Sequence, residues 1–193
     1  TQSIYAIKDT LAVTASPLGT AVYPNPRNNL CSVTSTTNCF VQNALVDSTA
    51  GVRTASSSIV ANFGTMDGWF ADLPETGERI NTEMNLQLGI LVFKSNLPGA
   101  GSTTCSAGGA SYLNYVNYTT GLAIPGQTNV GSELFTASGA TALANSSTLT
   151  MGSSGEVVAN TTTAGGGIVN TDLGQTSSTK GTRRISWREL MTN

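Results

Sequence analysis

The chain has 193 residues, no histidine and a formal net charge of −2, and charged residues make up only 10% of it. Without histidine it has no Ser–His or Cys–His nucleophile. The net charge argues against nucleic acid as a partner, with one exception, because Lys180, Arg183, Arg184 and Arg188 put four of the nine basic residues near the C-terminus. No segment of the sequence approaches the roughly 20 apolar residues that a membrane-spanning helix requires.

The composition favours an all-β fold in a single domain over residues 1–193. Serine, threonine and asparagine make up roughly a third of the chain, and their side chains compete with the backbone for the hydrogen bonds that a helix needs. Threonine and valine prefer pleated surfaces, and the 21 glycines supply turn positions. Disorder is the alternative for such a composition, but hydrophobic residues reach 39% and gather in short runs, which favours a core.

The N-terminal part of the chain predicts short strands separated by turns. In residues 1–8, Ile4, Tyr5, Ala6 and Ile7 stand against polar neighbours and predict a strand, and a second apolar run, LAVTA, precedes the turn-rich PNPRNN. FVQNALVDS at 40–48 predicts a strand, and GVRTASSS at 51–58 predicts its returning partner.

The most structured stretch runs from about residue 59 to 98. A turn at Asp67–Gly68 opens an aromatic segment, and the apolar run Leu86–Phe93 predicts a strand covered on both faces. SYLNYVNYTTGLAI then predicts a strand, a turn at Thr120–Gly121 and a short return. Residues 126–180 form a section rich in Gly, Ser and Thr, with brief strand candidates at SELFTA, STLTM, EVVAN and GGIVN.

Three cysteines, Cys31, Cys39 and Cys105, leave the disulfide pairing open. Cys31 and Cys39 bracket the polar loop SVTSTTN, a spacing that a disulfide-closed loop can use. The alternatives are ordinary buried thiols, or a bond between Cys105 and one of the other two. Three scattered cysteines without histidine cannot supply a conventional zinc site, so we expect no metal there.

Three strings follow one another along the chain in the order found in a known family. They are GWFADLPETGER, CSAGGAS and RRISWREL, and the opening QSIYAIKD is also similar to a strand of that family. Together they resemble the C-terminal domain of PilY/PilC-type proteins, the type IV pilus tip-associated adhesins and biogenesis factors. The resemblance spans residues 1 to about 190, and the first string matches the family motif at Gly68, Trp69, Asp72, Leu73, Pro74, Gly77, Glu78 and Arg79.

The resemblance implies a modified β-propeller displayed outside the cell, at the cell surface or pilus tip. Family members assist pilus assembly, oppose retraction and attach to surfaces, so the implied partners are minor pilins or other pilus components and a host or abiotic surface. Some members carry a calcium loop of the D-x-[DN]-x-[DN]-G type. No acidic residues here stand at that spacing, so we expect neither calcium ligands nor another cofactor.

The length of the chain suits only part of a propeller. A blade takes roughly 40–50 residues, so the chain supplies about four blades at most and resembles the last part of the family's propeller. Open edges leave unpaired backbone groups that promote pairing with other chains. Either an N-terminal portion stands beside these strands, or neighbouring copies of the chain occupy their edges.

Enzymatic chemistry would have to come from carboxylates. Five acids gather around Arg79, and a glycosidase would need two of them facing each other across a sugar: Asp67, Asp72, Glu75, Glu78 and Glu83. The alternatives are weak cation binding, or a solvated loop with a Glu78–Arg79 pair. The Gly-rich GAGSTT and AGGG lack the lysine of a phosphate-binding loop. We therefore expect no enzymatic activity.

Aromatic side chains offer a binding surface. Tyr112, Tyr115 and Tyr118 recur at a spacing of three, which alternates faces in a strand. Some of them should pack in the core, while one or two exposed rings could contact sugars or surfaces.

The C-terminal string at 183–190 predicts a latch strand. Ile185 and Trp187 alternate with Ser186, which suits a strand that docks onto a sheet as the closing strand of a propeller does. The alternative is contact with another pilus component. The proposed latch residues are Arg183, Arg184, Ile185, Trp187, Arg188, Glu189 and Leu190.

These features together predict an extracellular pilus-tip adhesin and biogenesis domain that acts by binding proteins and surfaces. The alternative is a structural subunit of an extracellular β-rich filament. A carbohydrate-active enzyme is the third hypothesis, and it would depend on Asp72, Glu75 and Glu78.

Overall fold

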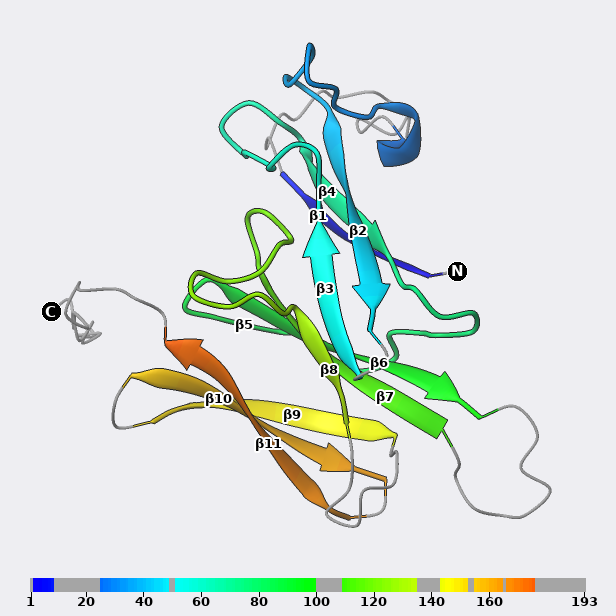
Figure 1. Cartoon of the computed structure of the whole chain (residues 1–193), viewed down its shortest axis with the longest axis vertical. Coiled ribbons are helices and arrows are strands. Elements are labelled where there is room, and N and C mark those ends of the chain that lie inside the picture. Colours follow the sequence, from blue (N-terminus) through cyan, green and yellow to red (C-terminus); the bar gives the residue numbers. More distant parts are fainter. Residues whose placement is uncertain are drawn as a thin grey trace, which may run out of the picture.

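The computed structural model describes residues 2–8, 25–48, 51–99, 109–134, 143–152, 155–164 and 166–175. Over these ranges the chain is all-β, with strands in two sheets and one 3-10 turn at Pro26–Asn28 (Figure 1). This confirms the predicted all-β, propeller-like sheets, in which β2 and β4 form the single parallel pair among the described strands. The described part of the chain contains no helix with the length and apolar character needed to span a membrane.

The larger sheet has eight strands in the order β1-β4-β2-β3-β8-β7-β6-β5. It divides into two four-stranded halves, because β3 and β8 pair only through Val52 with Ser132 and Arg53 with Gly131. The strand bounds are β1 Ser3–Ile7, β2 Phe40–Asp47, β3 Val52–Ser56, β4 Gly68–Asp72, β5 Asn85–Gln87, β6 Ile90–Pro98, β7 Gly109–Asn117 and β8 Gly131–Glu133.

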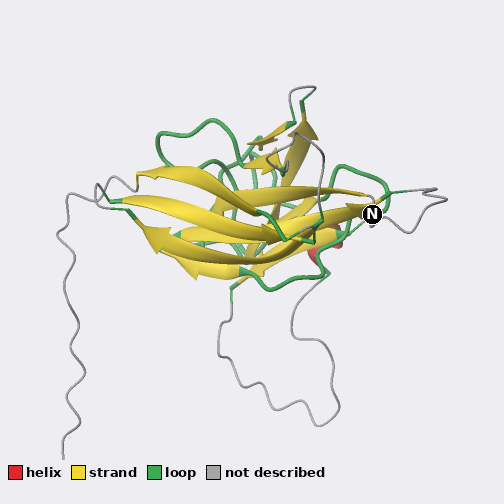
Figure 2. Ribbon diagram, turned by 90° about the horizontal axis from the view of Figure 1, so that it is seen from below, coloured by secondary structure: helices red, strands yellow, loops and turns green. Residues whose placement is uncertain are grey.

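The second sheet is an antiparallel meander of three strands in the order β11-β10-β9. Its strands are β9 Ala144–Met151, β10 Glu156–Thr163 and β11 Ile168–Gln175. The candidates STLTM, EVVAN and GGIVN thus become strands of eight residues each, whereas SELFTA overlaps only the three-residue strand β8 of the larger sheet. The side chains of β10 alternate between buried and half-buried. Figure 2 shows the strands lying in layers over one another.

The half of the larger sheet that contains β6 lies between two hydrophobic clusters. Phe93 belongs to the first cluster, with Ile4, Trp69, Val116 and Val130, where the two halves of the larger sheet meet. Ile90 and Val92 belong to the second, which lies against the three-stranded sheet and includes Leu113, Val157, Ala159 and Leu173. Because successive side chains of a strand point to opposite faces, β6 contributes to both clusters. The prediction of a strand covered on both faces is confirmed for this part of the chain.

The apolar run Leu86–Phe93 is nevertheless two strands and not one. Leu88 and Gly89 take positive φ angles of 51° and 82°, so the chain turns tightly between β5 and β6. Two adjacent positive-φ residues match the right-handed twist of the flanking strands and favour a hairpin. The turn leaves β5 at one edge of the larger sheet.

The other predicted strands lie close to their expected positions. β1 falls within residues 1–8, and β2 pairs antiparallel with β3 as predicted for 40–48 and 51–58. Gly121 takes φ +68° in the predicted turn. The LAVTA run, Cys105 and the proposed latch at 183–190 lie outside the described residues.

Candidate functional site

The first part of the family motif builds the core. Trp69 on β4 is 1% exposed, and its indole Nε1 donates a hydrogen bond to the Tyr118 carbonyl oxygen at 2.9 Å. Leu73 is buried in the same cluster. Gly68 has φ +154°, and a Cβ at this position would collide with the Ala6 carbonyl oxygen on β1. Glycine is therefore required here because β4 packs directly against the β1 backbone.

The second part of the motif holds a buried ion pair. Glu78 accepts from Arg53 through two hydrogen bonds, Nη1 to Oε1 at 2.8 Å and Nη2 to Oε2 at 3.2 Å. Arg53 also donates to Asp47 and to Asn114 Oδ1, and its guanidinium lies 4.0 Å from the centroid of the Tyr112 ring. Burial lowers the pKa of Arg53, but the hydrogen bonds that Arg53 donates to the two carboxylates outweigh it, and the pKa is raised overall.

Glu78 is consequently not part of a solvated Glu78–Arg79 pair. Ser95 donates its hydroxyl hydrogen to Glu78 Oε1, and the backbone N–H of Glu75 donates to Glu78 Oε2 at 3.2 Å. Arg79 is exposed, and its backbone pairs with that of Asn96 through two hydrogen bonds of 2.9 and 2.8 Å. Pro74 and Gly77 of the motif are exposed in the intervening loop.

Asp72 is held by a second arginine. Arg27 and Ser3 both donate to its carboxylate, and the Arg27 guanidinium holds the pKa of Asp72 below its ordinary value. Asp72 and Glu78 are thus each occupied by a different arginine, and Glu78 is shielded from solvent. Within the described ranges, no group of three or more His, Cys, Asp or Glu side chains could hold a metal ion.

Cys31 and Cys39 form a disulfide with an S–S distance of 2.03 Å. The first of the three pairing alternatives is therefore correct. A structural disulfide is compatible with an oxidising compartment such as the cell exterior.

The three tyrosines divide as their spacing predicts. Tyr112 and Tyr115 on β7 are buried, Tyr112 over Arg53 and Tyr115 in the cluster facing the three-stranded sheet. Burial raises the pKa of both phenols, that of Tyr112 to about 12. Tyr118 is 44% exposed and is the member of the set available for contact.

Tyr118 lines an apolar groove between the two edge strands of the larger sheet. The groove encloses about 340 Å³, and β1 contributes to one side while β5 and β6 contribute to the other. Its lining residues are Ala6, Ile7, Lys8, Phe63, Leu86, Leu91 and Tyr118. Sequence reasoning missed this groove because it depends on the curl that brings β1 and β5 together.

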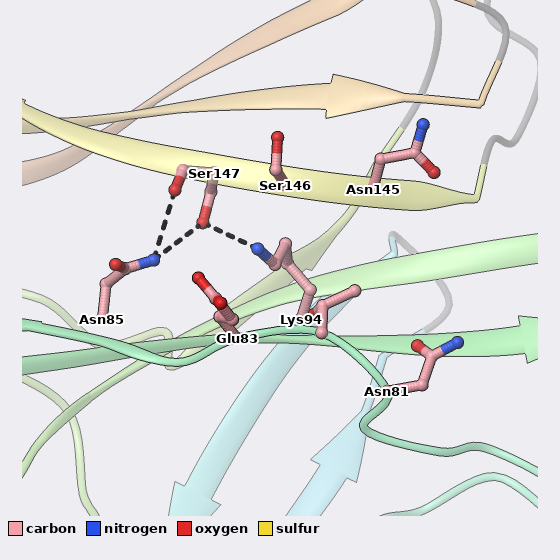
Figure 3. Close-up of a pocket in the computed structure, with 8 residues that line it drawn as sticks. Asn81, Glu83, Asn85, Lys94, Asn145, Ser146 and Ser147 are labelled. Carbon is pink, nitrogen blue, oxygen red and sulfur yellow. Dashed lines mark hydrogen bonds between the residues drawn. The ribbon is translucent and has the colours of Figure 1, made fainter.

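A polar cavity of about 260 Å³ lies between the larger sheet and β9. Figure 3 shows Asn85 of β5, Lys94 of β6 and Glu83, in the loop before β5, reaching toward Ser147 on β9. Asn85 Nδ2 donates to the carbonyl oxygen and hydroxyl of Ser147 at 3.2 and 3.4 Å. The cavity is lined by Asn81, Thr82, Glu83, Asn85, Lys94, Asn145, Ser146 and Ser147.

Lys94 is the unusual residue of this polar cavity. It is 1% exposed, and its Nζ donates to Ser147 Oγ at 3.1 Å. No carboxylate of the described residues lies within ion-pair distance of Nζ. Burial lowers the pKa of Lys94, and Glu83 partly opposes this. The sequence held a signal for this site, because Lys94 directly follows the apolar run that is predicted to be covered on both faces.

The fold and these features define an all-β, propeller-like protein with a disulfide-closed loop, a buried ion pair and two concave surfaces of opposite character. Comparison with known proteins found no family model, no curated protein and no solved structure that matches the chain.

Proposed function

We propose that the chain is an extracellular adhesin and biogenesis domain of the PilY/PilC type, associated with the tip of a type IV pilus. The organisation of its motif supports this proposal. Gly68, Trp69 and Leu73 pack the core, and Glu78 forms the buried ion pair. Each of these positions therefore has a structural reason to be what it is. Because these motif residues all contribute to packing the same fold, their match to the PilY/PilC-type motif supports a similar fold.

The observation that carries the proposal is that the two edge strands of the larger sheet, β1 and β5, both have a free edge beside the apolar groove. β1 pairs only with β4 and β5 only with β6 among the described strands, so each has one side without a strand partner. Both strands line the apolar groove, where Ile7 is 45% and Leu86 is 59% exposed. Free edges beside apolar side chains favour the addition of a strand from another chain.

The partner that suits this groove is an extended segment of another pilus component. Its backbone would continue the sheet beside β1, and alternate side chains would enter the groove beside Phe63 and Tyr118. Lys8 at the groove favours a segment that carries a carboxylate. In this arrangement, main-chain hydrogen bonds provide affinity and the apolar side chains select the partner.

Lysine substitutions in the groove test the proposal in the organism that encodes the chain. Ile7→Lys and Leu86→Lys should abolish or sharply reduce surface pili and attachment, while protein levels remain normal because both residues are exposed. Val33→Lys is the matched control, since Val33 is 80% exposed and lies in the disulfide loop. Normal piliation and attachment in both groove variants would refute the proposal.

The same free edges could instead accept other copies of the chain, which is the alternative of a β-rich filament. Electron microscopy of the purified chain separates the two functions. Ordered fibres of this chain alone would favour the filament subunit, and dispersed particles that bind a pilus component would favour the adhesin domain.

A further inference from the structure

The polar cavity has the properties of a binding site, although neither the sequence motifs nor the proposed pilus contacts use it. It lies where β9, the edge strand of the three-stranded sheet, comes up to β5 and β6 of the larger sheet. We propose that it binds an acidic saccharide, with the carboxylate of a uronic acid residue placed against Lys94.

Lys94 argues for an anionic group in the ligand. An ammonium has three donors, and Ser147 Oγ takes one of them at 3.1 Å. A lysine that is 1% exposed seldom stays without a charged partner, because burying an unpaired charge is costly. A ligand carboxylate would provide a charge-assisted hydrogen bond, which is about twice as strong as a neutral one.

The remaining lining argues for a saccharide. Apart from the carboxylate of Glu83, the side chains around Lys94 are amides and hydroxyls, which both donate and accept hydrogen bonds as sugar hydroxyl groups do. Thr82 Oγ1 is buried without a hydrogen-bond partner. Asn81 Oδ1 already accepts from Asn96 Nδ2 at 2.7 Å, which leaves the Asn81 amide nitrogen to donate. An apolar peptide side chain would leave these groups unsatisfied.

The cavity continues into a neighbouring hollow, so the site has room for more than one sugar residue. The hollow encloses about 320 Å³ and shares Asn85 and Ser147 with the cavity. It is lined also by Leu86, Gln87, Thr148 and Leu149, so it follows the facing strands β5 and β9. An oligosaccharide could lie along this groove with its acidic residue beside Lys94.

Glu83 provides a control, because its replacement should change the binding of an acidic sugar in the opposite direction to the replacement of Lys94. Its side chain is exposed and lies beside Lys94 at the cavity (Figure 3). It is close enough to raise the pKa of Lys94, and it would repel the carboxylate of an acidic ligand. Removing the charge with Glu83→Gln should therefore strengthen binding of an acidic sugar and leave that of a neutral sugar unchanged.

The test is an NMR titration of the whole 193-residue chain with glucuronate, glucose, acetate and a short acidic peptide. Glucuronate should bind about tenfold more tightly than glucose or acetate, and shift the side-chain amide signals of Asn81 and Asn85. Lys94→Met should weaken glucuronate binding about tenfold, and Glu83→Gln should strengthen it about two- to fivefold. Lys8→Met, which removes the same charge at the apolar groove, should change binding less than about twofold.

Each other outcome overturns the inference. If glucose binds as tightly as glucuronate, the ligand carboxylate contributes nothing at Lys94. If acetate binds as tightly as glucuronate, the site recognises a carboxylate alone and not a sugar. Tighter binding of the peptide would indicate a protein ligand, and no binding would dismiss the site. Glu83 is exposed, so its variant should fold and keep the test decisive even if Lys94→Met does not fold. The result is independent of the pilus test at Ile7, which lines the apolar groove and neither the polar cavity nor its neighbouring hollow, whereas Leu86 lines both the groove and the hollow.

Discussion

Arg53 on β3 and Glu78 in the loop after β4 form an ion pair from which solvent is excluded, since both side chains are 0% exposed. Arg53 also pairs through its backbone with Gly131 of β8, so the ion pair lies where the two halves of the larger sheet join. Asn114 of β7 binds the same guanidinium. The pair therefore links β3, the motif loop and the second half of the sheet, and it favours one relative placement of these elements.

Removing one member of this pair should destabilise the protein strongly. Glu78→Gln leaves the Arg53 charge buried with one carboxylate fewer, and we expect the free energy of unfolding to fall by about 3–5 kcal/mol. Urea denaturation followed by tryptophan fluorescence measures it, since Trp69 is buried in the adjoining cluster. Glu75→Gln in the same loop is the control and should change stability by less than about 0.5 kcal/mol.

A double variant shows whether the loss comes from the unpaired charge. Arg53→Met combined with Glu78→Met should cost less than the sum of Arg53→Met and Glu78→Met measured singly, because the two fully buried charges are then removed together. Asp47 loses its arginine in the double variant just as it does in Arg53→Met alone, so this loss does not affect the comparison. Additive single effects would contradict the direct coupling of Arg53 and Glu78.

The turn after β7 offers a second test, of packing against Trp69. Gly121 has φ +68°, and a Cβ there would collide with the Trp69 ring and with the Asn43 amide. Gly126 has a similar φ of +87° but nothing within 4 Å of an added Cβ. Gly121→Ala should therefore lower the free energy of unfolding by about 2 kcal/mol more than Gly126→Ala, which carries only the backbone strain. If thermal unfolding shows the same loss of unfolding free energy for both variants, the added Cβ at residue 121 does not clash with Trp69.

Much of the strand pattern could be predicted, because alternation and turn residues are local signals. β1, β2 and β3 lie where short runs containing apolar and β-branched residues stand between polar turns. The hairpin at Leu88–Gly89 was missed, because it lies within an unbroken apolar run and Leu88 takes a positive φ that leucine rarely adopts.

The candidate sites were harder to predict, because they depend on residues far apart in the chain. Arg53 lies on a short strand where a charge is ordinarily solvated, and its partner Glu78 comes 25 residues later. The polar cavity joins Lys94 to Ser147, which lies 53 residues further along. Neither local periodicity nor motif spacing contains such a contact. The lysine that directly follows the apolar run was nonetheless visible in the sequence and could have marked the cavity.

The Cys31–Cys39 disulfide should contribute measurably to stability. The bond closes a loop with a sequence separation of 8, and in the chain-entropy description a loop of this size contributes about 2–3 kcal/mol. Replacing both cysteines with alanine should lower the urea midpoint accordingly. Adding reductant should lower the urea midpoint of the natural chain by the same amount and leave the urea midpoint of the double variant unchanged. A further shift of the variant in reductant would implicate a bond other than Cys31–Cys39.

Lys94 should make stability depend on pH in the alkaline range. Burial lowers its pKa in the folded protein, whereas an unfolded lysine has a pKa of about 10.4. Between these two values the unfolded chain binds more protons than the folded one, so the contribution of Lys94 to the free energy of unfolding rises with pH. Below the folded pKa the lysine is charged in both states, and the full cost of burying the charge remains.

Lys94→Met isolates this effect, because the variant keeps an unbranched side chain of similar size. Ser147 Oγ still accepts from Asn85 at 3.4 Å, so the substitution leaves no orphaned hydroxyl. We expect the variant to be about 1 kcal/mol more stable at neutral pH, since apolar residues often replace buried charges without loss. Urea denaturation from pH 7 to about pH 10 should show this advantage shrinking as the natural lysine loses its proton. Tyr112 and Tyr115 titrate in both proteins, so their effect cancels in the difference. An advantage that stays constant over this range would mean that Lys94 remains protonated throughout.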